Sequence, residues 1–207
     1  MNTNAVGPEF RAVPDLVHEH ATARPRQAAL VQDDECIDYG TLDVLMDRVA
    51  AALQRDGVRP GDAIAICAHS SPRYAAVFLG ALRAGVAVAP LAPSVTAEQF
   101  VSMLRDSQAR LLFADAAAQA LLQGVGTRTI ALDTSIDGAA LDTWLAPIGS
   151  RPAPVALQPS WPFNIIYSSG TTGTPKGIVQ SHGMRWTHVM RGASYGYDKD
   201  TVTLLST

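Results

Sequence analysis

The sequence predicts an α/β fold in which a parallel β-sheet carries helices on its faces. Short apolar runs rich in Val, Ile, Leu and Ala recur along the 207 residues, and segments with helical periodicity separate them. Capping and turn residues stand at the junctions between the two kinds of segment. Hydrophobic residues make up 47% of the chain, which is enough to bury a sizeable core.

Helices and strands alternate in the first half of the chain. Thr41 is expected to cap a long helix, because apolar residues recur at helical spacing after it, and Gly57 stands where its C-terminal cap is expected. Pro72 in the first turn and Gly85 past the end mark another helix. The expected elements are a helix at 13–23, a hairpin of strands at 28–32 and 36–40, a helix at 41–57, a strand at 63–68, a helix at 70–85 and a strand at 86–91.

The same alternation continues in the second half. Thr96 and Gln99 have the spacing of a capping box, which predicts a helix that runs to about Ser107. The elements expected after it are strands at 109–115 and 127–132, helices at 116–124 and 138–147, strands at 163–167 and 177–181, a helix from about Met184 and a strand at 201–207.

Four parts are expected along the chain. Residues 1–12 are predicted to be a flexible N-terminus, and 13–146 to form an α/β subdomain. The stretch 147–160 is rich in Pro and has no periodicity, so it is expected to be a linker. Residues 161–207 are expected to begin a second subdomain.

Charge and composition exclude several classes of protein. The net charge is -3 and the basic residues are scattered, so no nucleic-acid partner is expected. Cys36 and Cys67 form no paired motif and lie in apolar runs, which favours two buried thiols in a reduced compartment. The N-terminus does not resemble a signal peptide, and the most apolar window is interrupted by Arg83, Gly85 and Pro90. A cytoplasmic protein without a membrane span is therefore expected; its oligomeric state is left open.

The stretch "YSSGTTGTPKG" at 167–177 carries the chemistry. Its glycines allow backbone amides to wrap an anion, its hydroxyl residues add donors, and Lys176 behind Pro175 adds a positive charge. The spacing fits neither a P-loop nor a dinucleotide-binding fingerprint, and a strand is expected after it in place of a helix. The pattern therefore predicts a phosphate-binding loop between two strands, with a hairpin turn that binds no ligand as the alternative.

The segment "IIYSSGTTGTPKG" at 165–177 closely resembles the AMP-binding signature of the adenylate-forming superfamily. That superfamily comprises acyl-CoA synthetases, aryl-CoA ligases, nonribosomal peptide synthetase adenylation domains and luciferases. "IVQSHGM" after the loop and "GALRAGVAVAPLAPS" before it also resemble family segments, so the likeness covers about 13–207. It implies an acetyl-CoA-synthetase-like N-terminal domain, truncated, because the family's enzymes are several hundred residues longer.

The resemblance implies an ATP-dependent carboxylate–CoA ligase, present as an N-terminal fragment that is inactive alone. Such an enzyme forms an acyl-adenylate with release of pyrophosphate and then a thioester. Lys176 is the implied catalytic residue, since its charge would offset that of the departing pyrophosphate. The residues that would cradle the phosphates, together with Lys176, are Ser168, Ser169, Gly170, Thr171, Thr172, Gly173 and Thr174.

The implied small-molecule partners are ATP, Mg²⁺, coenzyme A as co-substrate and a carboxylic acid that the sequence does not identify. Magnesium and coenzyme A would be bound mainly by regions absent from this sequence. The alternatives are an adenylation domain of a nonribosomal peptide synthetase-type system and a non-catalytic nucleotide-binding remnant.

The remaining candidate residues have structural interpretations. His182 follows the second strand and could shape the site, but a hydrogen-bonded core histidine is favoured. Trp161 and Trp186 are expected to pack in the core. His18 and His20 are two apart on a helix, so they face different ways and make a poor metal pair.

Overall fold

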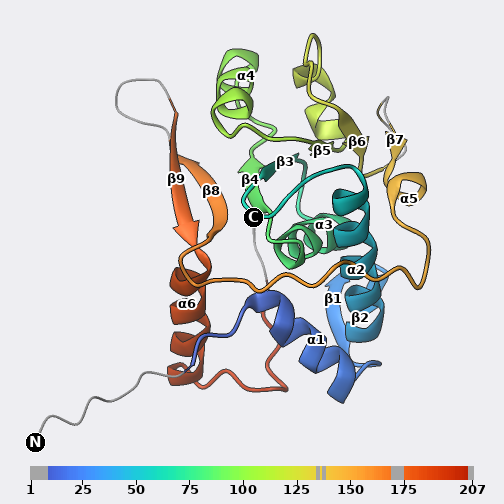
Figure 1. The fold of residues 1–207 in the computed structure, drawn as a ribbon, viewed down its shortest axis with the longest axis vertical. Coiled ribbons are helices and arrows are strands. Elements are labelled where there is room, and N and C mark those ends of the chain that lie inside the picture. Colours follow the sequence, from blue (N-terminus) through green and yellow to red (C-terminus); the bar gives the residue numbers. More distant parts are fainter. Residues whose placement is uncertain (1–8, 134–135, 137–138, 169–174, 205–207) are drawn as a thin grey trace, which may run out of the picture.

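The computed structural model describes residues 9–133, 136, 139–168 and 175–204. Its main feature is a seven-stranded sheet with the order β7-β6-β5-β3-β4-β8-β9 (Figure 1). Every neighbouring pair in this sheet is parallel except β8 and β9, which form an antiparallel hairpin at one edge. The seven strands are β3 (Ala63–Cys67), β4 (Ala87–Leu91), β5 (Leu112–Ala114), β6 (Thr129–Ala131), β7 (Ala139–Ala140), β8 (Pro162–Ser168) and β9 (Lys176–Ser181).

Helices cover both faces of the sheet, and a separate hairpin of β1 (Ala28–Gln32) and β2 (Glu35–Asp38) lies beside it. The predicted α/β class is confirmed. The helices are α1 (Val13–Ala23), α2 (Tyr39–Arg55), α3 (Pro72–Arg83), α4 (Ala97–Asp106), the 3₁₀ helix η1 (Ala116–Leu121), α5 (Leu141–Trp144) and α6 (His182–Ser194).

Alternating strand residues divide the core into two clusters. Ile64 and Ile66 of β3 pack with α2, α3 and α5 on one face of the sheet. Ala65 and Cys67 of the same strand point to the other face, where they pack with α4 and η1. This division follows from the two-residue period of a strand, and it buries β3 completely.

A cluster of charged side chains joins α1, α2 and α3 beneath the first face. The Arg83 guanidinium donates hydrogen bonds to Asp43 at 2.5 Å and Asp47 at 2.7 Å, and all three side chains are largely buried. His18 contacts Asp43, and Arg151 from the Pro-rich stretch contacts Asp47. Burial alone would raise the pKa of Asp43, but hydrogen bonds from Arg83 and His18 and their charges lower it overall.

Local signals placed several helix ends correctly. Thr96 and Gln99 form both hydrogen bonds of the predicted capping box at the start of α4. Pro72 occupies the first turn of α3, and Gly85 beyond its end has a positive φ of 73°. Gly57, with φ 79°, likewise follows the end of α2.

The prediction that Thr41 caps α2 is wrong. The Asp38 carboxylate accepts the Thr41 backbone N–H at 2.7 Å, so the helix begins at Tyr39. Both residues can act as caps, but Asp38 lies three residues earlier, at the spacing its side chain needs to reach that N–H group.

Four other predictions need correction. Residues 116–121 form a 3₁₀ helix capped by Asp115, and 138–147 contains a two-residue strand and one helical turn. Residues 201–204 form no strand, because Thr201 is held in a turn with Asp198. Cys67 is buried as predicted, but Cys36 is exposed, because it alternates with buried Ile37 on a hairpin only two strands wide.

The Pro-rich stretch at 147–160 contains no helix or strand. Hydrogen bonds between the Gln54 amide and the Ala153 backbone hold it against α2. After it, β8 adds to the sheet beside β4. The division into subdomains at 147–160 stays a prediction, as does a flexible N-terminus at 1–12, most of which lies outside the described residues. Among the described helices, none has the length and apolarity to cross a membrane.

Candidate functional site

The β8–β9 hairpin carries the two stems of the predicted phosphate-binding loop. Tyr167 lies opposite Gly177, and Ser168 lies opposite Lys176. The prediction that the loop joins two strands is therefore confirmed. The predicted phosphate ligands Ser169, Gly170, Thr171, Thr172, Gly173 and Thr174 lie outside the described residues.

The hairpin places the loop at the carboxyl edge of the parallel strands. β8 runs parallel to β4, so Ser168 stands at the end where β3 and β4 also finish. The connection from β4 leads to β5 on one side of the sheet, whereas β8 leads to β9 on the other. Neighbouring strands whose connections diverge in this way leave a crevice at their carboxyl ends, where α/β proteins bind their ligands.

A pocket of about 540 Å³ opens at this edge. It extends from His69 and Ser70 after β3, past the residues that follow β4, to Ile166 and Tyr167 of β8. Sequence reasoning missed it, because four stretches far apart in the chain form its wall. The one sequence signal for this pocket is the pair of polar residues, His69 and Ser70, that directly follows the predicted strand at 63–68.

Lys176 has the exposure that an anion-binding group requires. Its side chain is exposed at the start of β9, directly across from exposed Ser168. Across the part of the chain that the structure describes, Lys176 makes no ion pair. The two stems can therefore present a hydroxyl and an ammonium group to one anion.

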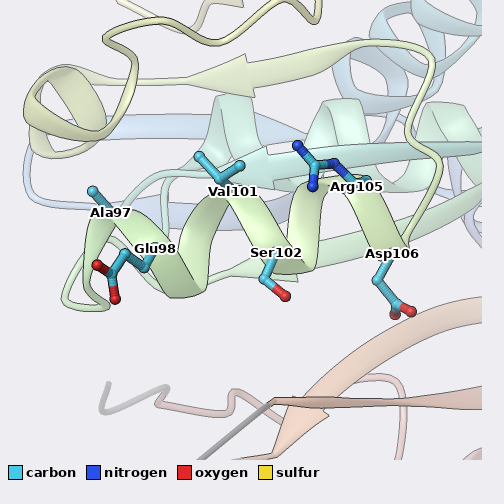
Figure 2. A pocket seen from close by; sticks show the side chains of 6 residues that line it. All are labelled: Ala97, Glu98, Val101, Ser102, Arg105 and Asp106. Atoms are coloured by element: carbon cyan, nitrogen blue, oxygen red, sulfur yellow. The ribbon is translucent and has the colours of Figure 1, made fainter.

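Helix α4 lies beside the hairpin. Figure 2 shows Glu98, Ser102 and Asp106 in a row along one side of α4, at a spacing of four residues, with Asp106 nearest the hairpin. They line a pocket of about 690 Å³ together with Ala97, Val101 and Arg105. At its end, the Tyr167 hydroxyl donates a hydrogen bond of 2.6 Å to the Asp106 carboxylate. Burial and this carboxylate both raise the pKa of Tyr167, so the hydroxyl keeps its proton.

His182 is buried as predicted, with 2% of its surface exposed. Its ring packs edge-on against Phe163 at 5.3 Å. The predicted hydrogen bond is wrong for the described residues, because neither ring nitrogen has a partner among them. Burial lowers the pKa of His182, although the Asp15 carboxylate opposes this shift.

Further polar atoms on β8 and α6 are buried without partners among the described residues. They are Asn164 Oδ1, Arg185 Nε and Trp186 Nε1. The Arg185 guanidinium also lies 5.4 Å from the centre of the Phe163 ring. Trp161 and Trp186 are half-buried, so they are packed less completely than a core position implies.

The described residues fit part of the implied ligand set. Ser168 and Lys176 suit the phosphates of ATP. No group of three His, Cys, Asp or Glu side chains within the described ranges is placed to hold a metal ion. Burial raises the pKa of Cys67 to about 12, which keeps this thiol protonated and unsuited to act as a nucleophile.

Comparison with known proteins agrees with the resemblance found in the loop sequence. A family model described as "AMP-binding enzyme" matches residues 17–206. The L-proline–[L-prolyl-carrier protein] ligase of Pseudomonas fluorescens is 36% identical over 177 residues, which cover 81% of this chain and 35% of the relative. Tyrocidine synthase 3 of Brevibacillus parabrevis is 35% identical over 173 residues, 83% of this chain and 3% of that protein.

Solved structures share the fold. VinN in complex with L-aspartate superposes with a TM-score of 0.77 at 25% identity, covering 91% of this chain and 49% of VinN. The O-succinylbenzoate coenzyme A synthetase of Bacillus subtilis in complex with AMP gives a TM-score of 0.76 at 21% identity, covering 92% and 48%. The chain thus spans about half of these solved chains and a smaller share of the curated relatives.

Proposed function

The chain belongs to the AMP-binding enzyme family, and we propose that it forms the phosphate-holding part of a ligase that activates a carboxylic acid as its adenylate and passes the acyl group to a thiol. One observation carries the proposal. The loop signature lies on a hairpin at the carboxyl edge of the sheet, with Ser168 and Lys176 facing each other across its base.

In the first half of this reaction, a carboxylate oxygen attacks the α-phosphorus of ATP. The new P–O bond forms as the bond to the bridging oxygen breaks, and pyrophosphate leaves. Ser168 and the loop donate hydrogen bonds to the β- and γ-phosphates, and the Lys176 ammonium opposes the charge that gathers on the leaving group. In the second half, a thiol attacks the acyl carbon, and AMP leaves.

We further propose that the acid is an amino acid and that the acceptor is a carrier-protein thiol. The printed name of one curated relative, L-proline–[L-prolyl-carrier protein] ligase, supports this choice, since it names an amino acid and a carrier protein. The sequence resemblance favoured coenzyme A as acceptor. A solved coenzyme A ligase at 21% identity supports the fold alone.

The test is pyrophosphate exchange by the intact gene product with panels of amino, fatty and aromatic acids. Exchange that depends on one or a few amino acids is the expected result. The activated acid is then offered to coenzyme A and to phosphopantetheinyl carrier proteins, and thioester formation on a carrier is expected. Exchange with fatty or aromatic acids and thioester formation on coenzyme A would restore the ligase predicted from the sequence.

The 207-residue chain alone is expected to show no turnover with any of these acids. It spans only 49% of the solved VinN chain and 35% of the L-proline–[L-prolyl-carrier protein] ligase. Pyrophosphate exchange by this chain at the rate of the intact gene product would contradict that expectation.

A further inference from the structure

Both stems of the loop meet α4 at a single carboxylate. On β8, the Tyr167 hydroxyl donates to Asp106 Oδ2 at 2.6 Å. On β9, a Cβ atom at Gly177 would stand 3.0 Å from the same oxygen and 3.2 Å from the Tyr167 ring. Gly177 is thus the residue that lets the two strands and the carboxylate come together. Figure 2 shows Asp106 at the end of α4, directed toward the hairpin.

Asp106 belongs to a well-anchored helix. The capping box fixes the first turn of α4, and Phe100 and Met103 bury its inner face. The buried Ser107 hydroxyl donates to the Leu104 backbone carbonyl and holds the last turn. Within the described ranges the Asp106 carboxylate forms no ion pair, and it accepts a side-chain hydrogen bond from the Tyr167 hydroxyl alone.

The position of this contact ties it to the loop. Tyr167 is followed directly by Ser168, and Gly177 is preceded directly by Lys176. A shift of one residue in the pairing of two strands sends every side chain to the opposite face. The backbone pairing of β8 with β9 therefore keeps Ser168 opposite Lys176, and the hydrogen bond from Tyr167 to Asp106 anchors this end of the hairpin to α4.

We propose that Asp106 is a positioning residue for the two stems of the phosphate-binding loop: by binding the Tyr167 hydroxyl it anchors the end of the β8–β9 hairpin to α4, and so holds the Ser168 hydroxyl and the Lys176 ammonium in place for one anion. This inference rests on the proposed function, because the anion is the polyphosphate of ATP. Asp106 acts through Tyr167 and touches no substrate.

The experiment measures pyrophosphate exchange by the intact gene product with Tyr167→Phe, Asp106→Ala, Asp106→Asn and the double variant Tyr167→Phe/Asp106→Ala. Because a hydrogen bond to a charged group is lost, Tyr167→Phe and Asp106→Ala are each expected to raise the KM for ATP about tenfold and to leave the KM for the acid unchanged. Asp106→Asn keeps an acceptor oxygen and is expected to recover most of the ATP affinity. The double variant is expected to match either single one, since both remove the same bond.

Trp144→Phe is the matched control. Trp144 also donates an aromatic-ring hydrogen bond to a carboxylate, that of Asp56 at 2.8 Å, but it lies on α5, which follows edge strand β7 at the opposite end of the sheet. Because Trp144 is buried in the core, its replacement by the smaller Phe is expected to cost at least as much stability as Tyr167→Phe, with no change in the KM for ATP.

The proposal is overturned if the KM for ATP in Tyr167→Phe stays within about twofold of wild type, or if both KM values move together as in a general loss of folded protein. The proposal is also overturned if the effects of the two single variants on the KM for ATP add in the double variant. Wild-type protein without any acid-dependent exchange would refute the proposed function itself, which is a separate outcome.

Discussion

Two regions of the sheet differ in how completely their apolar side chains are buried and their buried polar groups are hydrogen-bonded. Around β3 to β6 the apolar strand residues are covered on both faces. In the arm formed by β9 and α6, Ile178, Val179 and Met184 are 52%, 60% and 45% exposed. Next to them, the His182 ring is buried without a hydrogen-bond partner among the described residues. The first region is therefore a packed core. The arm, which carries one stem of the loop, has apolar side chains that are exposed and a buried histidine that has no hydrogen-bond partner among the described residues.

The largest expected loss in the stable region comes from Arg83→Met. Asp43 and Asp47 would remain largely buried without the guanidinium that joins them. Loss of one partner from a buried charge cluster costs about 3–5 kcal/mol. Urea unfolding measures the change. Arg73→Met, which removes an exposed pair with Asp142, is the control and is expected to cost less than about 1 kcal/mol. Equal losses in the two variants would contradict the account.

Gly80→Ala tests the crossing of α2 and α3. The added Cβ would stand 2.6 Å from Val49 Cβ and 3.0 Å from the Met46 carbonyl oxygen. Overpacking of this kind costs about 1–3 kcal/mol, so the unfolding midpoint in urea should fall. Gly126→Ala meets nothing within 4 Å and should stay within about 0.5 kcal/mol of wild type. A neutral Gly80→Ala would mean that the helices can separate at no cost.

His182 gives the arm a pH dependence. Burial lowers its pKa below the ordinary value of 6.5, so the unfolded chain binds more protons in the window between the two values. Stability should therefore fall as the pH drops below 6.5 toward the lowered pKa of His182.

Unfolding curves for His182→Phe test this sign. The variant keeps an aromatic ring against Phe163 and should lose less stability than wild type over the same pH range. His188→Asn, at an exposed position of α6, is the control and should follow wild type. A steeper acid loss in His182→Phe would contradict the assignment.

The smallest expected effect is at Val179→Thr on β9. Its side chain is 60% exposed, so the free energy of unfolding should change by no more than about 0.5 kcal/mol. The same substitution at fully buried Val88 on β4 should cost about 1–3 kcal/mol, because its hydroxyl would be buried. Equal costs would mean that the two regions do not differ as described.

Signals contained within a few residues could be predicted from the sequence. The Thr96 capping box, Pro72 in its helix and the strand–loop–strand pattern around 167–177 depend on neighbours, and the structure confirms them. Thr41 is expected as the cap because Tyr39 and Gly40 are assigned to the strand at 36–40, whereas the strand ends at Asp38 and the helix begins at Tyr39. Competition between two good caps is decided by geometry that the sequence does not display.

Long-range contacts could not be predicted. Tyr167 and Asp106 are 61 residues apart, and each has an ordinary alternative role on its own element. The unpartnered ring of His182 depends on how α6 packs against β8, and sequence reasoning assumed a hydrogen bond there. Most of the predicted loop ligands lie outside the described residues, so their roles stay predictions, while Ser168 and Lys176 are placed.

The central claim is that Lys176 and the loop hold the phosphates of ATP during adenylate formation. Its most direct test compares pyrophosphate exchange by Lys176→Met and Lys199→Met in the intact gene product. Lys199 is exposed and paired with Asp200, away from the hairpin, so its variant should keep wild-type exchange. Lys176→Met should lose about a hundredfold or more, as expected when a group that stabilises developing charge is removed. Exchange within about twofold of wild type in Lys176→Met would contradict the account.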